Sequence, residues 1–176
     1  MKKKSAWLWA GLLMAGAGGW WVLAEEIELG VMLGDRVNVR ARPLGTAEIC
    51  CQLRKDDLVE ILERRSSTAD GGGSTNAEEW VRIVLPEQAM VWIQTEFLTD
   101  VNGRQVTRKR VNGRAGPGLA WPPLCLLDKE EEVTVRTNAV EWAGVAPSRK
   151  ASGWVAGRFV GKSDKAVVAA PLAEKP

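Results

Sequence analysis

The chain has 176 residues, which is enough for one ordinary domain or two small ones. It contains nine Trp but no Tyr and no His, which excludes Ser-His-Asp and Cys-His catalysis and histidine metal ligation. The net charge is +2, and without residues 1–24, which carry three Lys and no acid, 21 basic residues stand against 22 acidic ones. A near-neutral chain has no electrostatic footprint for nucleic acid, so no nucleic-acid partner is expected.

Residues 1–24 have the pattern of an export signal. Three lysines at positions 2–4 precede an uncharged, mostly apolar stretch, and Ala24 offers a small residue for cleavage. The alternative is an uncleaved signal anchor in the inner membrane, because the 19 residues of 6–24 are marginally long enough to span a bilayer. In both cases we expect residues 25–176 to be exported, periplasmic or extracellular, with membrane contact only through residues 6–24 if they are retained.

The rest of the chain is a duplication. The stretch 37–43 (VNVRARP) returns as 111–117 (VNGRAGP), at an offset of 74 residues. Later landmarks return at an offset of 62, namely Glu79 as Glu141, Trp80 as Trp142, Trp92 as Trp154 and Phe97 as Phe159. The difference places an insertion of 12 residues in the first copy, and residues 65–77 (RSSTADGGGSTNA) have the composition of a flexible loop. We therefore expect two copies of one small unit, the first with a longer loop.

Short strands separated by turn residues are expected in the first unit, residues 27–98. Val59 and Ile61 alternate with polar Glu60, which is the period of a half-buried strand. Pro86-Glu87-Gln88 is a turn signal between two strands. The strands expected are 31–40, 49–53, 58–62, 80–85 and 90–93, followed by one short turn at 94–98. Outside the N-terminal segment no window has a helical period, so we predict an all-β class with each unit a small barrel.

The second unit, residues 104–160, is expected to repeat this arrangement. Asn102-Gly103 is a turn dipeptide, and the short connection 99–104 predicts that the two barrels lie against each other. The strands expected are 111–114, 124–127, 132–136, 142–146 and 153–156. Residues 161–176 are rich in Ala, Pro and Lys and are expected to be disordered.

Both copies contain Asn-x-Arg-x-x-Pro, an apolar strand, a charged turn, Glu-Trp and a closing Phe, and the second adds Gly153-Trp154-Val155. This order of motifs resembles the bacterial Src-homology-3 (SH3-like) domain family over nearly all of residues 31–160. The first copy departs from the family at Arg42, where Gly is usual, and at Val91-Trp92-Ile93, which replaces Gly-Trp-Val. The resemblance implies a compact barrel of about five strands in each copy. It also implies an extracytoplasmic binding module of a kind often attached to cell-wall hydrolases.

Three tryptophans are candidates for ligand binding. Trp121 lies in a loop (GLAWPP) and has no counterpart in the first copy, where Ala47 occupies its position. Its alternative role is to cover a barrel end. Trp80 and Trp142 recur at matched places, which is typical of core residues, although their position beside the variable loop favours partial exposure.

Arg40 and Arg114 are further candidates, because a guanidinium group binds carboxylates with two parallel hydrogen bonds. The commoner alternative is structural: the Asn two residues before each Arg caps a turn, and the Arg packs across the sheet.

Cys50, Cys51 and Cys125 are odd in number for an exported protein. The simplest interpretation is that they are small buried hydrophobic residues, and a Cys50–Cys125 or intermolecular disulfide is the alternative. Redox catalysis is not expected, because the chain has no Cys-x-x-Cys motif. No metal or other cofactor is expected either, because equivalent strand cysteines in two different barrels would not converge on one metal ion. The acidic pair 56–57 and the acidic triplet 130–132 are expected in solvated turns rather than in acid–base catalysis.

Together these patterns predict a non-enzymatic exported protein that binds cell-wall peptidoglycan peptides or another envelope component. Two copies at a short fixed spacing would raise avidity on a repetitive polymer. The alternative is a membrane-tethered adaptor that binds an envelope protein. A third hypothesis, a redox or metal protein that uses the cysteines, has the least support in the sequence.

Overall fold

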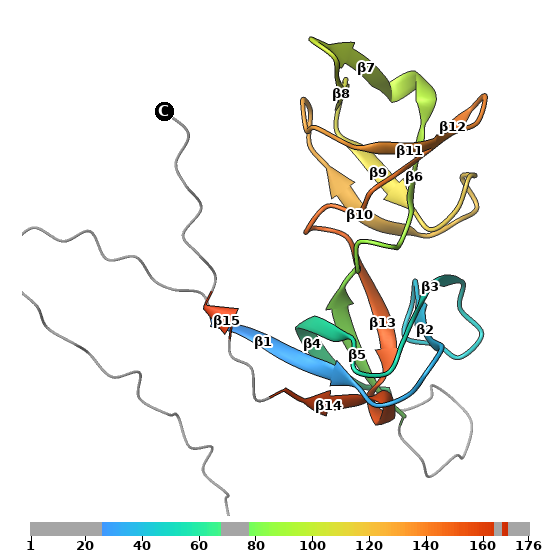
Figure 1. Ribbon diagram of the computed structural model, residues 1–176. Helices are drawn as coiled ribbons and strands as arrows, with labels where there is room; N and C mark the ends of the chain where they lie inside the picture. Colours follow the sequence, from blue (N-terminus) through green and yellow to red (C-terminus); the bar gives the residue numbers. More distant parts are fainter. Residues whose placement is uncertain (1–25, 68–77, 164–166, 169–176) are drawn as a thin grey trace, which may run out of the picture.

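The computed structural model describes residues 26–67, 78–163 and 167–168 (Figure 1). These residues form no α-helix, and their only helical turns are the 3-10 turns η1 (Thr95–Phe97) and η2 (Gly157–Phe159). The all-β class predicted from the sequence is confirmed, as is the short turn at 94–98. The expected signal or anchor, 1–24, lies outside the described residues, as does most of the inserted loop 65–77.

The strands form two lobes, one above the other in Figure 1. The lower lobe contains β1 (Glu26–Met32), β2 (Val37–Arg40), β3 (Ile49–Leu53), β4 (Leu58–Ser67), β5 (Glu78–Val84), β13 (Ser152–Ala156), β14 (Val160–Lys162) and β15 (Val167–Val168). The upper lobe contains β6 (Val91–Gln94), β7 (Leu98–Val101), β8 (Arg104–Thr107), β9 (Val111–Arg114), β10 (Pro123–Leu127), β11 (Val135–Asn138) and β12 (Trp142–Val145).

The lower lobe is one sheet in the order β14-β1-β4-β5-β13-β2-β3, with β15 paired to β1. The upper lobe has a five-stranded sheet in the order β10-β9-β6-β12-β11 and the separate hairpin β7-β8. No sheet formed by the described residues closes into a barrel. The described residues form fifteen strands where the sequence predicted ten. The predicted strand 31–40 is two strands, β1 and β2, the predicted strand 132–136 starts only at Val135, and β7, β8, β14 and β15 were not predicted. Barrel closure is not seen in the described residues.

The two repeats exchange their last strands. By sequence β6 belongs to the first repeat, yet it lies between β9 and β12 of the second; β13 belongs to the second repeat and lies between β5 and β2 of the first. Trp154 is opposite Arg40 in one lobe, and Trp92 is opposite Arg114 in the other. Since Arg40 and Arg114 are equivalent, as are Trp92 and Trp154, the same strand pair is formed twice with the repeats in reversed roles.

The connection between the units therefore differs from the expectation. Residues 99–104 do not join two barrels but turn the β7-β8 hairpin, with positive φ of 55° at Asn102 and 79° at Gly103. The chain passes between the lobes at 85–90 and again at 146–151. The turn signal at 86–88 lies in the first of these crossings, and β5 and β6 on either side of it do not pair with each other, because each has its partner in a different lobe.

The tail expected to be disordered, 161–176, is partly ordered. Gly161 and Lys162 continue β14 and pair with β1, and Val167–Val168 forms β15 on the same strand. An edge strand offers unpaired backbone N–H and C=O groups, which explains why the tail is held there despite its composition. Strand β4 also extends to Ser67, into the expected loop, because it pairs with β5 as far as Glu78.

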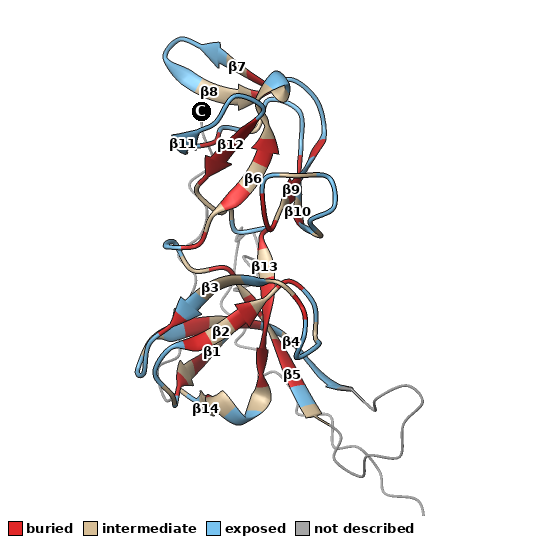
Figure 2. Cartoon of the chain, turned by 90° about the vertical axis from the view of Figure 1, so that its right-hand side faces the viewer, coloured by how far each residue is buried: buried red, intermediate tan, exposed pale blue. Residues whose placement is uncertain are grey.

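The exchanged strands carry core side chains into the other repeat. Val155 of β13 is completely buried opposite Val81 in the lower lobe, and Ile93 of β6 is completely buried opposite Ala143 in the upper lobe. Figure 2 shows these strands in the colour of buried residues. Full burial of one such aliphatic side chain stabilises a fold by about 1.5–3 kcal/mol. Each lobe thus depends on apolar residues supplied by both repeats.

Candidate functional site

A groove in the upper lobe brings together two of the residues predicted as site residues, Arg114 and Trp142. It encloses about 190 Å³. Its lining consists of Gln94, Phe97, Lys109, Arg110, Val111, Asn112, Arg114, Leu119 and Trp142. Gln94 and Phe97 come from the first repeat and the other lining residues from the second, so the exchange of β6 creates this groove.

The strand register places the groove on the outer face of the upper sheet. Trp142 is opposite Gln94, and Arg114 is opposite Trp92. Gln94 and Trp92 are two residues apart on β6, so these side chains share one face of the sheet. Ile93, between them, points into the core on the other face.

The lining of the groove has three basic side chains and no acidic one. The ammonium group of Lys109 lies 3.9 Å from the centroid of the Phe97 ring. Nε of Arg110 lies 3.6 Å from Oδ1 of Asp128, outside the groove. Positive charge beside an indole and a leucine is complementary to a ligand that carries a carboxylate next to an apolar group.

Sequence reasoning identified Arg114 but missed the other two basic residues of this groove, Lys109 and Arg110, although the signal was present. The second repeat has Arg108-Lys109-Arg110 before β9, where the first has Gly34-Asp35-Arg36 before β2. The stretch that borders the upper groove therefore carries three bases, and its counterpart in the lower lobe carries one base and one acid. A comparison of the two copies for charge would have drawn attention to it.

Arg114 and Arg40 have the same structural role. Nη1 of Arg114 donates hydrogen bonds to the carbonyl oxygens of Leu119 at 3.1 Å and Trp121 at 2.8 Å. Nη1 of Arg40 donates to the carbonyl oxygen of Ala47 at 2.5 Å, and Ala47 is the counterpart of Trp121. Each guanidinium group therefore fixes the loop after its own strand, and Arg114 also lines the groove. This structural role differs in detail from the alternative stated for the sequence, because Asn38 caps no turn but accepts a hydrogen bond from Nε2 of Gln52 on β3 at 2.8 Å.

Trp121 is 37% exposed and packs on a glycine of its own loop. A Cβ added at Gly116 would lie 2.3 Å from Cδ2 of the Trp121 ring, so only glycine allows the ring to take this place. The ring is outside the groove lining, but its carbonyl group is bonded to Arg114, which lies in that lining.

Trp80 and Trp142 are more buried than the sequence suggested. Trp80 is 4% exposed and packs with Trp154 and Ala156, and the guanidinium group of Arg65 lies 5.0 Å from the centroid of the Trp154 ring. Trp142 is 9% exposed but still lines the groove. Partial exposure is thus not observed for Trp80, because the lower lobe covers this face with its own side chains.

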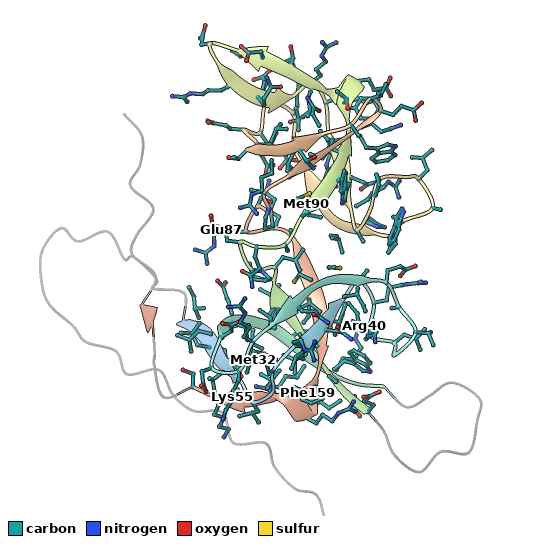
Figure 3. The ribbon with its side chains drawn as sticks, turned by 45° about the vertical axis from the view of Figure 1, so that its right-hand side comes forward. Met32, Arg40, Lys55, Glu87, Met90 and Phe159 are labelled. Carbon is teal, nitrogen blue, oxygen red and sulfur yellow. The ribbon has the colours of Figure 1, made fainter. Side chains whose placement is uncertain are left out.

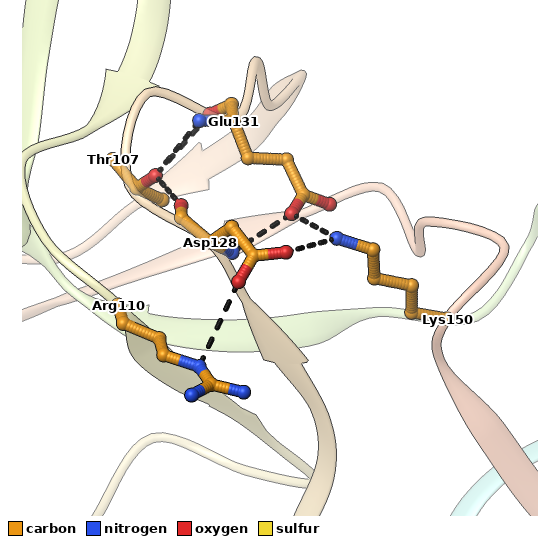
Figure 4. A network of polar contacts seen from close by, with 5 residues as sticks. All are labelled: Thr107, Arg110, Asp128, Glu131 and Lys150. Carbon is orange, nitrogen blue, oxygen red and sulfur yellow. Dashed lines mark hydrogen bonds and ion pairs between the residues drawn. The ribbon is translucent and has the colours of Figure 1, made fainter.

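An ion-pair network borders the groove at Arg110 (Figure 4). Nζ of Lys150 lies 2.7 Å from Oδ2 of Asp128 and 2.7 Å from Oε2 of Glu131. The hydrogen bond from Lys150 lowers the pKa of Asp128, and the same contact raises the pKa of Lys150 to about 12. Since Lys150 lies in the second crossing segment, the network ties that segment to the turn after β10.

The three cysteines are free and half-buried. Burial raises the pKa of Cys50 to about 12 and the pKa values of Cys51 and Cys125 to about 11. All three are therefore thiols rather than thiolates at neutral pH. Within the described part of the chain, no group of three or more His, Cys, Asp or Glu side chains converges as a metal site.

Among the residues that the structure describes, none belongs to a helix long and apolar enough to cross a membrane. Comparison of the chain with protein-family models, curated proteins and solved structures gives no match.

Proposed function

We propose that the chain is a non-enzymatic binding protein of the cell envelope, built from two SH3-like repeats, that recognises peptidoglycan stem peptides through the upper groove. The observation that carries the proposal is the set of three bases beside Trp142 with no acid in the lining. A stem peptide offers carboxylates next to short apolar side chains. The carboxylates would pair with Lys109 and Arg114, and the apolar part would lie against Leu119 and Trp142.

The export pattern of residues 1–24 supports this setting, because it would bring the groove to the cell wall. The upper lobe is the better candidate of the two, since the corresponding stretch of the lower lobe contains Asp35 and Gly45 where the upper has bases and Leu119. We accordingly assign one main site to the upper lobe rather than one to each repeat.

Co-sedimentation of purified residues 25–176 with isolated sacculi tests the proposal. Lys109→Glu reverses an exposed charge of the groove, and Lys55→Glu makes the same charge change on an exposed turn of the lower lobe (Figure 3). We expect the wild type and Lys55→Glu to sediment with sacculi, and Lys109→Glu to sediment much less. A wild type that stays in the supernatant would exclude wall binding.

A second outcome points to the alternative function. If sacculi do not bind the protein and residues 1–24 keep it in the membrane fraction, the protein is a membrane-tethered adaptor, and cross-linking in cells should then capture a protein at the upper groove. Equal binding by Lys109→Glu and Lys55→Glu would retain wall binding but exclude the upper groove as its site.

A further inference from the structure

Exchange is not the only way in which two equivalent repeats can complete their sheets. A β5-β6 hairpin in the first repeat and a β12-β13 hairpin in the second would supply the same strand pairs inside each repeat. We propose that the side chains at positions 39, 91, 113 and 153 select the exchange, so that each lobe is an acceptor site for the last strand of the other repeat.

The first contact is in the lower lobe, where Gly153 of β13 packs against Val39 of β2. A Cβ added at Gly153 would lie 2.6 Å from Cγ1 of Val39, 3.0 Å from Cδ2 of Leu85 and 3.2 Å from the carbonyl oxygen of Arg40. The position is closed on three sides, one of them backbone. A residue larger than glycine therefore cannot enter here without displacing its neighbours.

The second contact is in the upper lobe, where Val91 of β6 packs against Gly113 of β9. A Cβ added at Gly113 would lie 2.4 Å from Cγ1 of Val91 and 2.7 Å from Sγ of Cys125. Gly113 is the counterpart of Val39, and Val91 is the counterpart of Gly153. Both contacts thus join one valine to one glycine, with the two residue types in reversed order.

Closure within each repeat would break both contacts. Strand β6 in the lower lobe would bring Val91 against Val39, where even one added carbon is too close. Strand β13 in the upper lobe would bring Gly153 against Gly113 and leave a hole lined by Cys125. Overpacking and cavity formation both destabilise a core, so the exchanged arrangement is favoured at both sites.

Charges on the two crossing segments, 85–90 and 146–151, also favour the exchanged arrangement. The segments share one local conformation, since the Ala89 N–H donates to Pro86 and the Ala151 N–H to Ser148, each at 2.9 Å. At the equivalent positions 87 and 149 they carry opposite charges, Glu87 and Arg149.

Each of these charges meets its opposite in the lobe that the segment enters. Nη2 of Arg149 lies 2.8 Å from Oε2 of Glu60, and Nη2 of Arg136 lies 3.6 Å from Oε1 of Glu87, at the waist of the molecule (Figure 3). Closure within each repeat would bring Glu87 toward Glu60 and Arg149 toward Arg136. These pairs are solvent-exposed, so their contribution is smaller than that of the valine–glycine contacts.

The test is to cut the chain between the repeats. A protease site placed in the exposed Asn102-Gly103 turn gives two fragments, one with β1–β7 and one with β8–β15. In the exchanged fold the fragments stay interlocked and co-elute from a sizing column without denaturant. We expect this for the wild type, and we expect V91G/G153V/E87R/R149E to separate into two folded fragments. Separation of the wild-type fragments, or continued interlocking of the quadruple variant, would overturn the proposal.

A double-mutant cycle at positions 39 and 153 tests the proposal even if the quadruple variant does not fold. Gly153→Val should lower the melting temperature, and V39G/G153V should recover most of that loss, because the valine and the glycine have only changed sides. If the two changes in melting temperature simply add, positions 39 and 153 do not select the exchange.

Discussion

Trp154 on β13 lies directly opposite Arg40 on β2, although the two residues belong to different repeats. The equivalent pair, Trp92 and Arg114, forms in the other lobe. In each pair the arginine also holds the loop that follows its own strand, through Nη1 and a carbonyl oxygen. The strand supplied by the other repeat therefore pairs with the strand that carries the arginine, and this arginine fixes a loop of the lobe that receives the strand.

Truncation of Ile93 tests whether the lobes unfold as one unit. Ile93→Ala removes a completely buried side chain from the upper lobe and should cost about 2–5 kcal/mol of unfolding free energy. Because β6 is joined to β5 by only a few residues, we expect one transition in urea, followed by tryptophan fluorescence and by circular dichroism. Leu119→Ala, at a 67% exposed residue, is the control and should change stability little. Two separate transitions would show that the lobes are independent.

Loss of either structural arginine should destabilise the protein. Arg40→Ala leaves the Ala47 carbonyl without its charged donor, and Arg114→Ala does the same for Trp121. Hydrogen bonds to charged groups are worth about 1.5–3 kcal/mol, so a loss near the lower end is expected at these partly exposed sites. Urea unfolding measures it, and a wild-type midpoint for both variants would rule out the role. Arg54→Ala, on an exposed turn, serves as the comparison.

Gly116→Ala should displace the Trp121 ring. The added methyl group would lie 2.3 Å from a ring atom, so the indole must swing away toward solvent. A red shift of the tryptophan emission and greater quenching by iodide are the expected results. Gly118→Ala is the matched control, since its added carbon would be 3.3 Å from the nearest ring atom. Identical spectra for wild type and Gly116→Ala would contradict the packing described.

The three thiols should make the protein unstable in alkali. Burial raises their pKa values from 9.0 to about 12 for Cys50 and about 11 for Cys51 and Cys125. A thiol with a raised folded-state pKa contributes stability that is complete below pH 9 and is lost as the pH rises through the folded values. Unfolding free energy should therefore fall above pH 9, and a triple Cys→Ala variant should lose this dependence. Rapid alkylation of all three thiols at pH 8 would show that they are not protected.

The network at Lys150 predicts a loss of stability in acid. The folded-state pKa of Asp128 is lowered by its hydrogen bond with Lys150. Its contribution is therefore present above the unfolded pKa of 3.8 and is lost as the pH falls through the lower folded value. The pKa of Lys150 is raised to about 12, so its contribution is lost only in strong alkali.

Asp128→Asn should remove part of the acid dependence, and 1 M salt should weaken the effect because the network is exposed. Lys129→Met removes a neighbouring lysine that pairs only with Glu130 among the contacts described, and it should leave the pH profile unchanged. A profile that is the same for Asp128→Asn and wild type from pH 2 to pH 7 would exclude this role.

Local patterns predicted the elements well, because alternation and turn residues act over a few positions. Ile49–Leu53 and Val111–Arg114 are strands with the predicted bounds, and Asn102-Gly103 is a turn. The duplication also indicated which residues are equivalent. It did not indicate which repeat each strand completes, since Val91 and Gly153 satisfy the same strand pattern in either arrangement.

The site was harder to predict because it depends on that arrangement. Trp142 and Arg114 were identified as candidates, but Gln94 and Phe97 reach the groove only through the exchange of β6. The exposure of Trp80 was overestimated. The arginine side chains that cover its neighbour Trp154 come from β4 and β5, and the spacing of residues in the sequence does not reveal them.

The position of β13 in the lower lobe affects how the protein can fold during synthesis. During synthesis residues 26–84 emerge before β13, and the place between β2 and β5 stays empty until Ser152–Ala156 has left the ribosome. The sheet of the first repeat therefore stays incomplete until almost the whole chain has been synthesised. Until then its apolar side chains are accessible to chaperones. Contacts between residues so far apart in sequence also make folding slow.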